Sequence, residues 1–144
     1  MRKKVLSGVS VVAYLKDTIK YGMTCAWIMP CDYDQLLLLL GSQSDTANAL
    51  EVGDKIGISI LAQNQKDIAL HFGDNHSKTF DKFDGVKYEL DEDSIVISNS
   101  KSKFVCEVVK MGYIEGNDED HLVQVKILKE DVNEELEFLS MTNL

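Results

Sequence analysis

The feature that most constrains the fold of this chain is a succession of short strand-like segments, with helical spacing at only two places. Residues 5–15 are rich in valine, residues 35–41 are apolar on both faces, and residues 55–61 place isoleucines at alternate positions. Further strands are expected at 21–29, 86–90, 95–98, 103–114 and 121–128, and helices at 47–52 and 64–72. About seven or eight strands with two or three short helices predict a mainly β, Greek-key-like barrel rather than βαβ units.

Turn and capping residues predict where these segments end. Pro30 should stop the strand at 21–29, because proline lacks a backbone N–H. Asp45 or Thr46 can cap the first helix, and Gly53 and Gly73 suit the C-terminal ends of the two helices. The other expected boundaries are a hairpin turn at 17–20, a loop or short helical turns at 73–85, a hairpin loop at 116–120 and a terminal helix at 130–144.

Length and charge narrow the function classes. A chain of 144 residues fits a single domain, which we assign to residues 1–144. With 24 acidic and 15 basic residues the formal net charge is −9, which disfavours partners such as nucleic acid or an anionic membrane surface. No apolar run approaches the ~20 residues of a membrane-spanning helix.

The expected location is the cytoplasm. The apolar stretch at 5–15 is interrupted by Ser7, Gly8 and Ser10 and is not followed by a signal-peptide cleavage site. Three cysteines are too few for a disulfide-rich secreted scaffold and fit a reducing compartment.

Familiar enzyme signatures are missing from the sequence. It contains no G-x-G-x-x-G, no phosphate-binding GK[ST] loop and no G-x-S-x-G. No metal site is expected, because the cysteines lack C-x-x-C spacing and the histidines are scattered. A Cys–His nucleophile pair stays open, although no spacing supports it. The residues concerned are Cys25, Cys31, Cys106, His71, His76 and His121.

A hydroxyl-rich segment follows the strand at 35–41 and leads into the first helix. Ser42, Ser44 and Thr46 lie where the free amides of a helix N-terminus are expected. Such a site can bind a phosphate. The hydroxyls can equally serve only to cap the helix. From this spacing alone both interpretations stay open.

Six short motifs follow one another along the chain. They are G-M-T-x-x-W at 22–27, the small-residue loop at 42–46, S-I-L at 59–61, Q-x-x-I-A-x-x-F at 65–72, D-K-F at 81–83 and D-H-L at 120–122. No single motif is specific, but the six in this order resemble the flavin reductase family over roughly residues 5–128. The resemblance implies an FMN-binding split β-barrel.

The resemblance also implies the roles of individual segments. The isoalloxazine ring would lie against residues 23–27, the phosphate in the 42–46 loop and the ribityl chain beside residues 59–61. Lys82 would supply positive charge near the cofactor or, alternatively, be a solvated lysine. Trp27 would pack near the ring or, alternatively, in the barrel core. The implied cofactor-binding residues are Met23, Thr24, Cys25, Ala26, Trp27, Ser42, Gln43, Ser44, Thr46, Ser59, Ile60, Leu61 and Lys82.

The chain departs from the family pattern at positions that bear on the cofactor. Ala26 stands where serine is common, Ser59 replaces an asparagine, and Asp45 lies near a position that is often basic. A carboxylate beside a phosphate is repulsive, by about 1 kcal/mol at 4 Å in water and several times that at a lower effective dielectric. We therefore expect Asp45 to turn away from the phosphate and cap the helix.

The expected function follows from the flavin. FMN would take a hydride from NADH or NADPH or pass electrons to a redox partner protein, and no side chain needs to act as acid or base. The acidic surface favours NADH, with Lys82 and His76 as the nearest positive groups. A second subunit would cover the flavin, so a homodimer is expected. The alternatives are an FMN-binding electron carrier that does not use nicotinamide, and a split-barrel binding module that has lost flavin.

Overall fold

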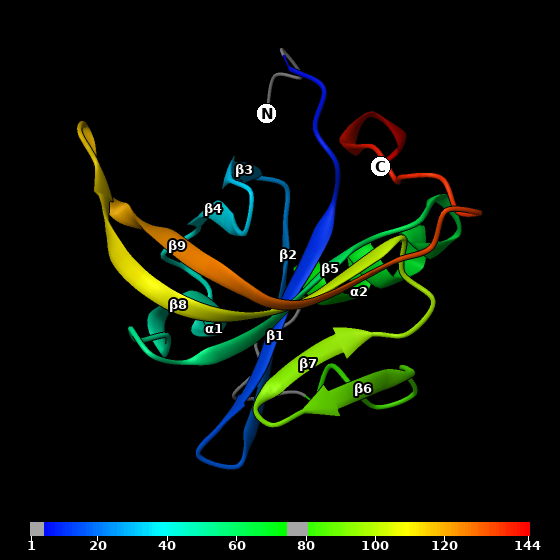
Figure 1. Ribbon diagram of the computed structural model, residues 1–144, viewed down its shortest axis with the longest axis horizontal. Coiled ribbons are helices and arrows are strands. Elements are labelled where there is room, and N and C mark those ends of the chain that lie inside the picture. Colours follow the sequence, from blue (N-terminus) through cyan, green and yellow to red (C-terminus); the bar gives the residue numbers. More distant parts are fainter. Residues whose placement is uncertain (1–4, 75–80) are drawn as a thin grey trace.

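The computed structural model describes residues 5–74 and 81–144. Within them the chain forms a 9-stranded antiparallel sheet in the order β3-β4-β9-β8-β5-β1-β7-β6, with β2 paired to β1 (Figure 1). The strands are β1 Ser10–Lys16, β2 Ile19–Cys25, β3 Ile28–Asp32, β4 Gln35–Leu40, β5 Lys55–Ile60, β6 Tyr88–Asp91, β7 Ser94–Ile97, β8 Ser102–Ile114 and β9 Asn117–Val132. The helices are α1 Asp45–Asn48, η1 Gln63–Gln65, α2 Lys66–Asp74 and η2 Met141–Asn143. The predicted mainly β fold with a few short helices is confirmed.

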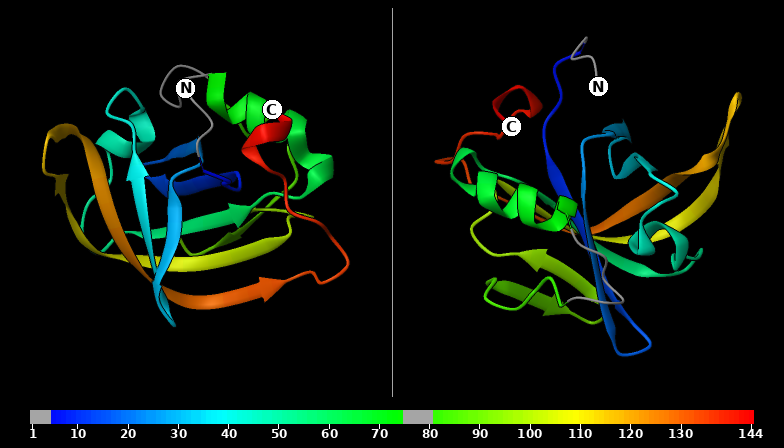
Figure 2. Two further views of the ribbon diagram at one scale, coloured as in Figure 1. Left: turned by 90° about the horizontal axis from the view of Figure 1, so that it is seen from above. Right: turned by 180° about the vertical axis from the view of Figure 1, so that it is seen from behind.

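The sheet curls because its longest strands are bent. Strand β8 contains three register shifts against β9, and such bulges bend a strand and increase its twist. Strand β1 contributes to closure by pairing with β2, β5 and β7. Figure 2 shows the curved sheet with α2 on one side, and Figure 1 shows the β8–β9 hairpin extending away from the body of the molecule.

Alternation along β1 divides the core between two faces of the sheet. Val12 and Tyr14 pack inside the barrel with the buried leucines of β4 and isoleucines of β5. Val11 and Ala13 point the other way, toward α2 and β7. One sheet thus has an apolar interior and a second apolar face that fixes α2 against it.

The predicted strand at 21–29 is divided into β2 and β3. Pro30 does not end it but lies inside β3, opposite Leu36 of β4. Because β3 is the edge strand of the sheet, the missing proline N–H costs no ladder bond on the paired side. The run at 35–41 is apolar on both faces, which predicts a central strand buried on both sides. Strand β4 instead lies next to this edge, and only its alternate leucines Leu36, Leu38 and Leu40 are buried.

Several predicted boundaries also differ. Helix α1 is one turn capped by Ser44 and ends before Ala49, so Gly53 does not cap it. Helix α2 continues past Gly73 to Asp74. The β8–β9 turn lies at 115–116, earlier than the predicted 116–120 loop.

The tail at 130–144 was predicted to be helical, and this was wrong. Strand β9 continues to Val132, and the remaining residues form single bridges from Phe138 to Ala62 and from Ser140 to Gly8 before η2. In the part of the chain that the structure describes, no helix has both the length and the apolar character needed to cross a membrane.

Candidate functional site

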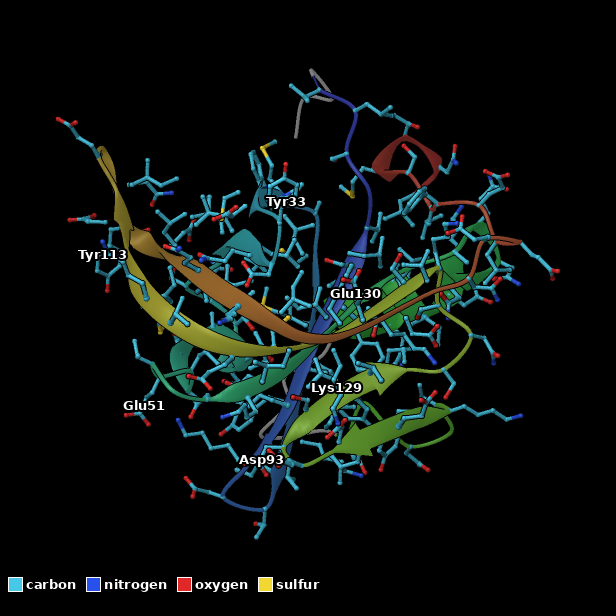
Figure 3. All side chains as sticks on the ribbon, in the orientation of Figure 1. Tyr33, Glu51, Asp93, Tyr113, Lys129 and Glu130 are labelled. Carbon is cyan, nitrogen blue, oxygen red and sulfur yellow. The ribbon has the colours of Figure 1, made fainter. Side chains whose placement is uncertain are left out.

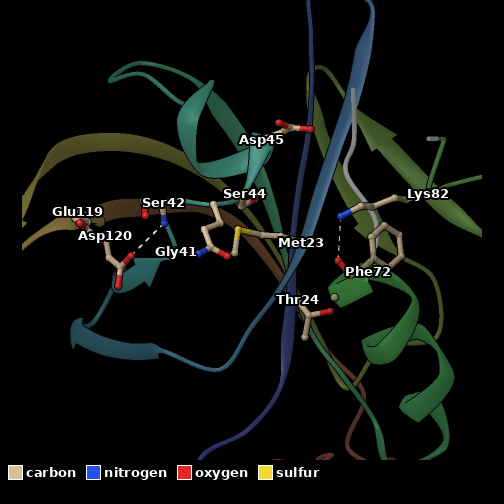
Figure 4. A pocket seen from close by; sticks show the side chains of 12 residues that line it. Met23, Thr24, Gly41, Ser42, Ser44, Asp45, Phe72, Lys82, Glu119 and Asp120 are labelled. Carbon is tan, nitrogen blue, oxygen red and sulfur yellow. Dashed lines mark hydrogen bonds between the residues drawn. The ribbon is translucent and has the colours of Figure 1, made fainter. Parts of the chain in front are cut away.

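A cavity of about 410 Å³ opens between β2, the loop from β4 to α1, the C-terminal end of α2 and the start of β9 (Figure 4). Its volume lies in the range of small-molecule and cofactor pockets. Met23 and Phe72 supply an apolar wall, and the rest of the lining is polar. The lining residues are Met23, Thr24, Gly41, Ser42, Gln43, Ser44, Asp45, Phe72, Gly73, Lys82, Glu119 and Asp120.

Strand β2 and helix α2 form one wall of the cavity and are joined by two side chains. The Lys82 Nζ donates to the carbonyl oxygens of Gly22 at 2.7 Å and Phe72 at 3.0 Å. The Thr24 hydroxyl donates to the carbonyl of Ala69. A Cβ at Gly22 would lie 2.9 Å from the Phe72 ring, so a glycine allows β2 to approach the helix this closely.

Lys82 is buried, with 3% of its surface exposed. Burial lowers the pKa of its ammonium group, and the Asp45 carboxylate partly opposes that shift. The Lys82 carbonyl lies 2.7 Å from Nε2 of His71, so the main chain of Lys82 also contacts α2. Lys82 is therefore held by both β2 and α2, and the alternative of a solvated lysine is wrong.

The opposite wall is the loop between β4 and α1, and its groups bond largely to the chain itself. The Ser42 N–H donates to Oδ1 of Asp120 at 3.0 Å. The Ser44 hydroxyl accepts from the N–H groups of Thr46 at 3.1 Å and Ala47 at 3.4 Å, which makes Ser44 the cap of α1. The Asn117 side chain and Ser42 lower the pKa of Asp120 by donating to its carboxylate.

Charged side chains of both signs line the cavity. Among the described residues these are the carboxylates of Asp45, Glu119 and Asp120 and the ammonium of Lys82. The C-terminal end of α2 also meets the cavity at Gly73 and adds the partial negative charge of a helix C-terminus.

The structure brings together part of the predicted cofactor set. Met23, Thr24, Ser42, Gln43, Ser44 and Lys82 line the cavity. The predicted residues outside its lining are Cys25, Ala26, Trp27, Thr46, Ser59, Ile60 and Leu61.

The residues outside the lining have other surroundings. The Ser59 hydroxyl accepts from the Ile97 N–H at 2.8 Å, and Leu61 is buried in the core beneath α2. The Thr46 hydroxyl is buried without a hydrogen-bond partner among the described residues. Trp27 is 57% exposed, so the alternative that placed it in the barrel core is wrong.

Sequence reasoning missed several cavity residues. Asp45 was expected to turn away and cap α1, but Ser44 is the cap and Asp45 lines the cavity. Phe72 fitted the helical pattern of a core residue, and nothing in the sequence placed Glu119 beside the 41–45 loop. Asp120 was noted only as part of the D-H-L element. His76 lies outside the described residues.

Cys25 and Cys106 have the surroundings of small core residues, whereas Cys31 is exposed on β3. Burial raises the pKa of the Cys25 thiol to about 11 and that of Cys106 to about 12, so both are protonated at neutral pH. A thiol in that state is a poor nucleophile. Across residues 5–74 and 81–144, no group of three or more potential metal ligands is gathered.

The comparisons with known proteins place the chain in a family. The family model described as "Flavin reductase like domain" matches residues 1–140. The chain belongs to the flavin reductase-like family. No curated protein matches the sequence.

Solved structures of flavin reductase-like proteins share this fold. The NADH:FAD oxidoreductase SgcE6 of Streptomyces globisporus superposes with a TM-score of 0.84 at 20% identity, covering 94% of this chain and 81% of that one. For the flavin reductase PheA2 the TM-score is 0.76 at 21% identity, with coverage of 91% and 82%. For BorF, the flavin reductase component of a bacterial two-component tryptophan halogenase, the TM-score is 0.78 at 17% identity, covering 92% of this chain and 83% of that one. The split-barrel fold expected from the sequence is confirmed.

The chemistry of the cavity suits the ring end of a flavin. An isoalloxazine needs an apolar surface for its faces and polar groups around its edge. Met23 and Phe72 provide the first, while Thr24, Gln43 and the main chain of β2 provide the second. These residues fit the flavin chemistry of the family.

Proposed function

We propose that this chain is a flavin oxidoreductase that binds FMN in the cavity beside β2 and accepts reducing equivalents from NADH or NADPH. The observation that carries the proposal is the cavity itself, where β2 residues Met23 and Thr24 face the 41–45 loop in a member of the flavin reductase-like family. When bound, the flavin supplies the redox chemistry, as hydride acceptor and electron donor.

The residues of the chain position the cofactor and shape its surroundings. Lys82 fixes the end of α2 on β2 and places one positive charge at the wall. The main chain along residues 23–27 holds the ring edge, and residues 59–61 lie on the ribityl side. No side chain has to transfer a proton, so we assign no catalytic residue.

NADH is the donor that we favour. The carboxylates of Glu119 and Asp120 at the cavity oppose the approach of the additional phosphate of NADPH. Hydride transfer needs the nicotinamide in contact with an exposed ring face. Mixing FMN-loaded protein with excess NADH without oxygen should bleach the flavin absorbance, faster than NADPH does.

The same charges favour a second candidate, an electron carrier that exchanges electrons with a redox partner protein. Its supporting observation is that the carboxylates at the cavity also oppose the pyrophosphate of any nicotinamide dinucleotide. Bleaching by dithionite but by neither nicotinamide would establish the carrier and reject the reductase.

We further propose a homodimer of single-domain chains in the cytoplasm. Large apolar side chains are exposed on the β3 edge and on the β8–β9 hairpin, including Trp27, Met29 and Tyr113. The three cysteines are all free, which fits a reducing compartment.

A further inference from the structure

We propose that Tyr14 and Lys16, two residues of β1 outside the lining of the cavity, position its loop wall to bind the phosphate end of FMN. The inference rests on the proposed flavin site and deepens it by naming two positioning residues. Both act through helix α1, which follows the loop and carries part of that wall.

Helix α1 is too short to hold its own position. It is a single turn of 4 residues, Asp45–Asn48. Isolated helices shorter than about 12 residues are marginal in water, because nucleation orders several residues for the first hydrogen bond. The position of α1 therefore depends on its contacts with the rest of the chain.

Strand β1 supplies two of these contacts from one face. Tyr14 and Lys16 are two positions apart, so their side chains point to the same side of the strand. The Tyr14 hydroxyl donates to the carbonyl of Thr46 at 2.5 Å. The Lys16 Nζ donates to the carbonyl of Ala49 at 2.8 Å. One bond lies near the start of α1 and the other directly after its end, so together they fix both the position and the direction of the helix.

The Tyr14 side chain is itself confined. It is 1% exposed, and its ring stacks on that of Tyr21 with the ring centroids 5.1 Å apart. Burial raises the pKa of the Tyr14 hydroxyl above its ordinary value, so the group stays a protonated donor at neutral pH. Tyr14 therefore gives α1 a fixed point of attachment in the core.

Lys16 holds the end of α1 together with the turn that follows it. Its Nζ also contacts Oε1 of Glu51 at 2.6 Å and Oδ2 of Asp54 at 2.8 Å. The same Asp54 oxygen accepts from the Glu51 N–H at 2.8 Å. With the Ala49 carbonyl, each of the three N–H groups of the ammonium has an acceptor in the 49–54 segment.

The position of α1 reaches the cavity through two hydrogen bonds. Ser44 lines the cavity, and its hydroxyl accepts from the Thr46 N–H at 3.1 Å. The Asn48 side chain donates to the carbonyl of Ser42 at 2.8 Å, and Ser42 lies on the same wall (Figure 4). A shift of α1 therefore moves both serines. Holding α1 in place before the ligand arrives lowers the entropic cost of binding to this wall.

Only one end of the flavin should depend on the position of α1. In the proposed site the ring lies against β2, and the phosphate is expected in the 42–46 loop. Riboflavin shares the ring and the ribityl chain with FMN but has no phosphate. Displacement of α1 should therefore weaken the binding of FMN and leave that of riboflavin nearly unchanged.

Tyr14→Phe removes one hydroxyl and has a matched control. Tyr21→Phe makes the same change in the other ring of the stacked pair, where the hydroxyl makes no hydrogen bond to α1. Quenching of flavin fluorescence measures the Kd of each flavin. Tyr14→Phe should raise the Kd of FMN at least about fivefold, as for the loss of one hydrogen bond, and leave that of riboflavin within about twofold. Tyr21→Phe should leave both Kd values within about twofold of the wild type.

Lys16 provides an independent set of variants. Lys16→Met removes three hydrogen bonds and should raise the Kd of FMN at least about fivefold. Lys16→Arg keeps the charge and several N–H donors, so it should raise that Kd less than about threefold. Lys55→Met removes the same charge from the neighbouring strand β5, where the ammonium pairs with Glu107 at 3.0 Å, and should change neither Kd.

The outcomes separate this inference from the function on which it rests. An unchanged Kd of FMN in Tyr14→Phe, or an equal rise for FMN and riboflavin, would overturn the positioning role and leave the flavin function intact. An equal loss of FMN affinity in Tyr21→Phe would also overturn it, because the bond to α1 would then not be the cause. Wild-type protein that binds neither flavin would overturn the proposed function and the inference together.

Discussion

At the scale of single residues, the same side chain has opposite effects on stability depending on its partners. Thr24 and Thr46 show this most directly. The Thr24 hydroxyl donates to the carbonyl of Ala69 and joins β2 to α2. The Thr46 hydroxyl is fully buried and has no partner among the described residues, so it was desolvated without compensation.

Replacing each threonine by valine should therefore change stability in opposite directions. Thr24→Val removes a hydrogen bond and leaves the Ala69 carbonyl without that donor, so the free energy of unfolding should fall by about 1 kcal/mol. Thr46→Val removes an unpaired hydroxyl at nearly constant volume. The free energy of unfolding of this variant should therefore rise by up to about 1 kcal/mol. Urea titrations measure the free energy of unfolding of both variants. A lower free energy of unfolding for Thr46→Val would contradict the prediction for that residue.

The Asp120 carboxylate predicts a pH dependence of stability. Donors from Asn117 and Ser42 lower its folded-state pKa below 3.8. Between that lowered value and 3.8, the unfolded chain binds more protons than the folded one, so stability is lost as pH falls through this window. Asp120→Asn should lose less stability between about pH 5 and pH 3 than the wild type. The control Asp118→Asn should follow the wild type; identical curves for all three proteins would show that Asp120 contributes nothing.

At the scale of secondary structure elements, the local sequence pattern predicts which segments are strands but not which strands pair with each other in the sheet. The alternation of apolar residues in β5 and the apolar run of β4 identify these segments as strands, because such patterns involve only residues close together in the sequence. Pro30 fits inside β3 because β3 is an edge strand, and only the order of strands in the sheet determines that. The first residues of the tail likewise extend β9 by pairing in the sheet, although their local pattern is helical.

The candidate site was predictable only where its residues are close in sequence. Met23 and Thr24 on β2 and the 42–44 loop could be found, because each belongs to a short motif. Glu119 lines the cavity from the start of β9, and β9 reaches the loop only by pairing with β4. Ser44 rather than Asp45 caps α1, and the sequence alone does not distinguish them because both residue types cap helices equally well.

The crossing of β5 and β7 gives a prediction for an element. A Cβ at Gly57 would lie 1.9 Å from the carbonyl oxygen of Ile95, a contact that main chain on both sides cannot relieve. Gly57→Ala should therefore lower the free energy of unfolding by about 3 kcal/mol or more, or prevent folding. Gly112→Ala in β8, where nothing lies within 4 Å of the added carbon, should change it by less than about 1 kcal/mol. The measurement is thermal unfolding of the two variants. Equal stabilities of Gly57→Ala and Gly112→Ala would contradict the close approach of β5 to the Ile95 carbonyl.

At the scale of the whole molecule, the two ends of the sheet differ in character. The β3 end exposes Trp27, Met29 and Tyr33, and Tyr113 projects from the hairpin beyond β9 (Figure 3). The β6 end exposes Leu90 among charged neighbours, including Glu89 and Asp91. Exposed apolar groups that lie together indicate a protein–protein contact, whereas a single exposed leucine does not.

We therefore expect the β3 end to form the dimer contact. A closed two-fold pair is the commonest oligomer and would join the same patch on both chains. Sedimentation at micromolar concentration should give about twice 16.2 kDa for the wild type. Met29→Glu places a charge in the patch on each chain and should shift the mass toward the monomer. Leu90→Glu makes the equivalent change at the other end of the sheet, where the residue is 54% exposed, and should leave the dimer intact. A wild-type monomer that binds flavin tightly would show that the cavity needs no second subunit.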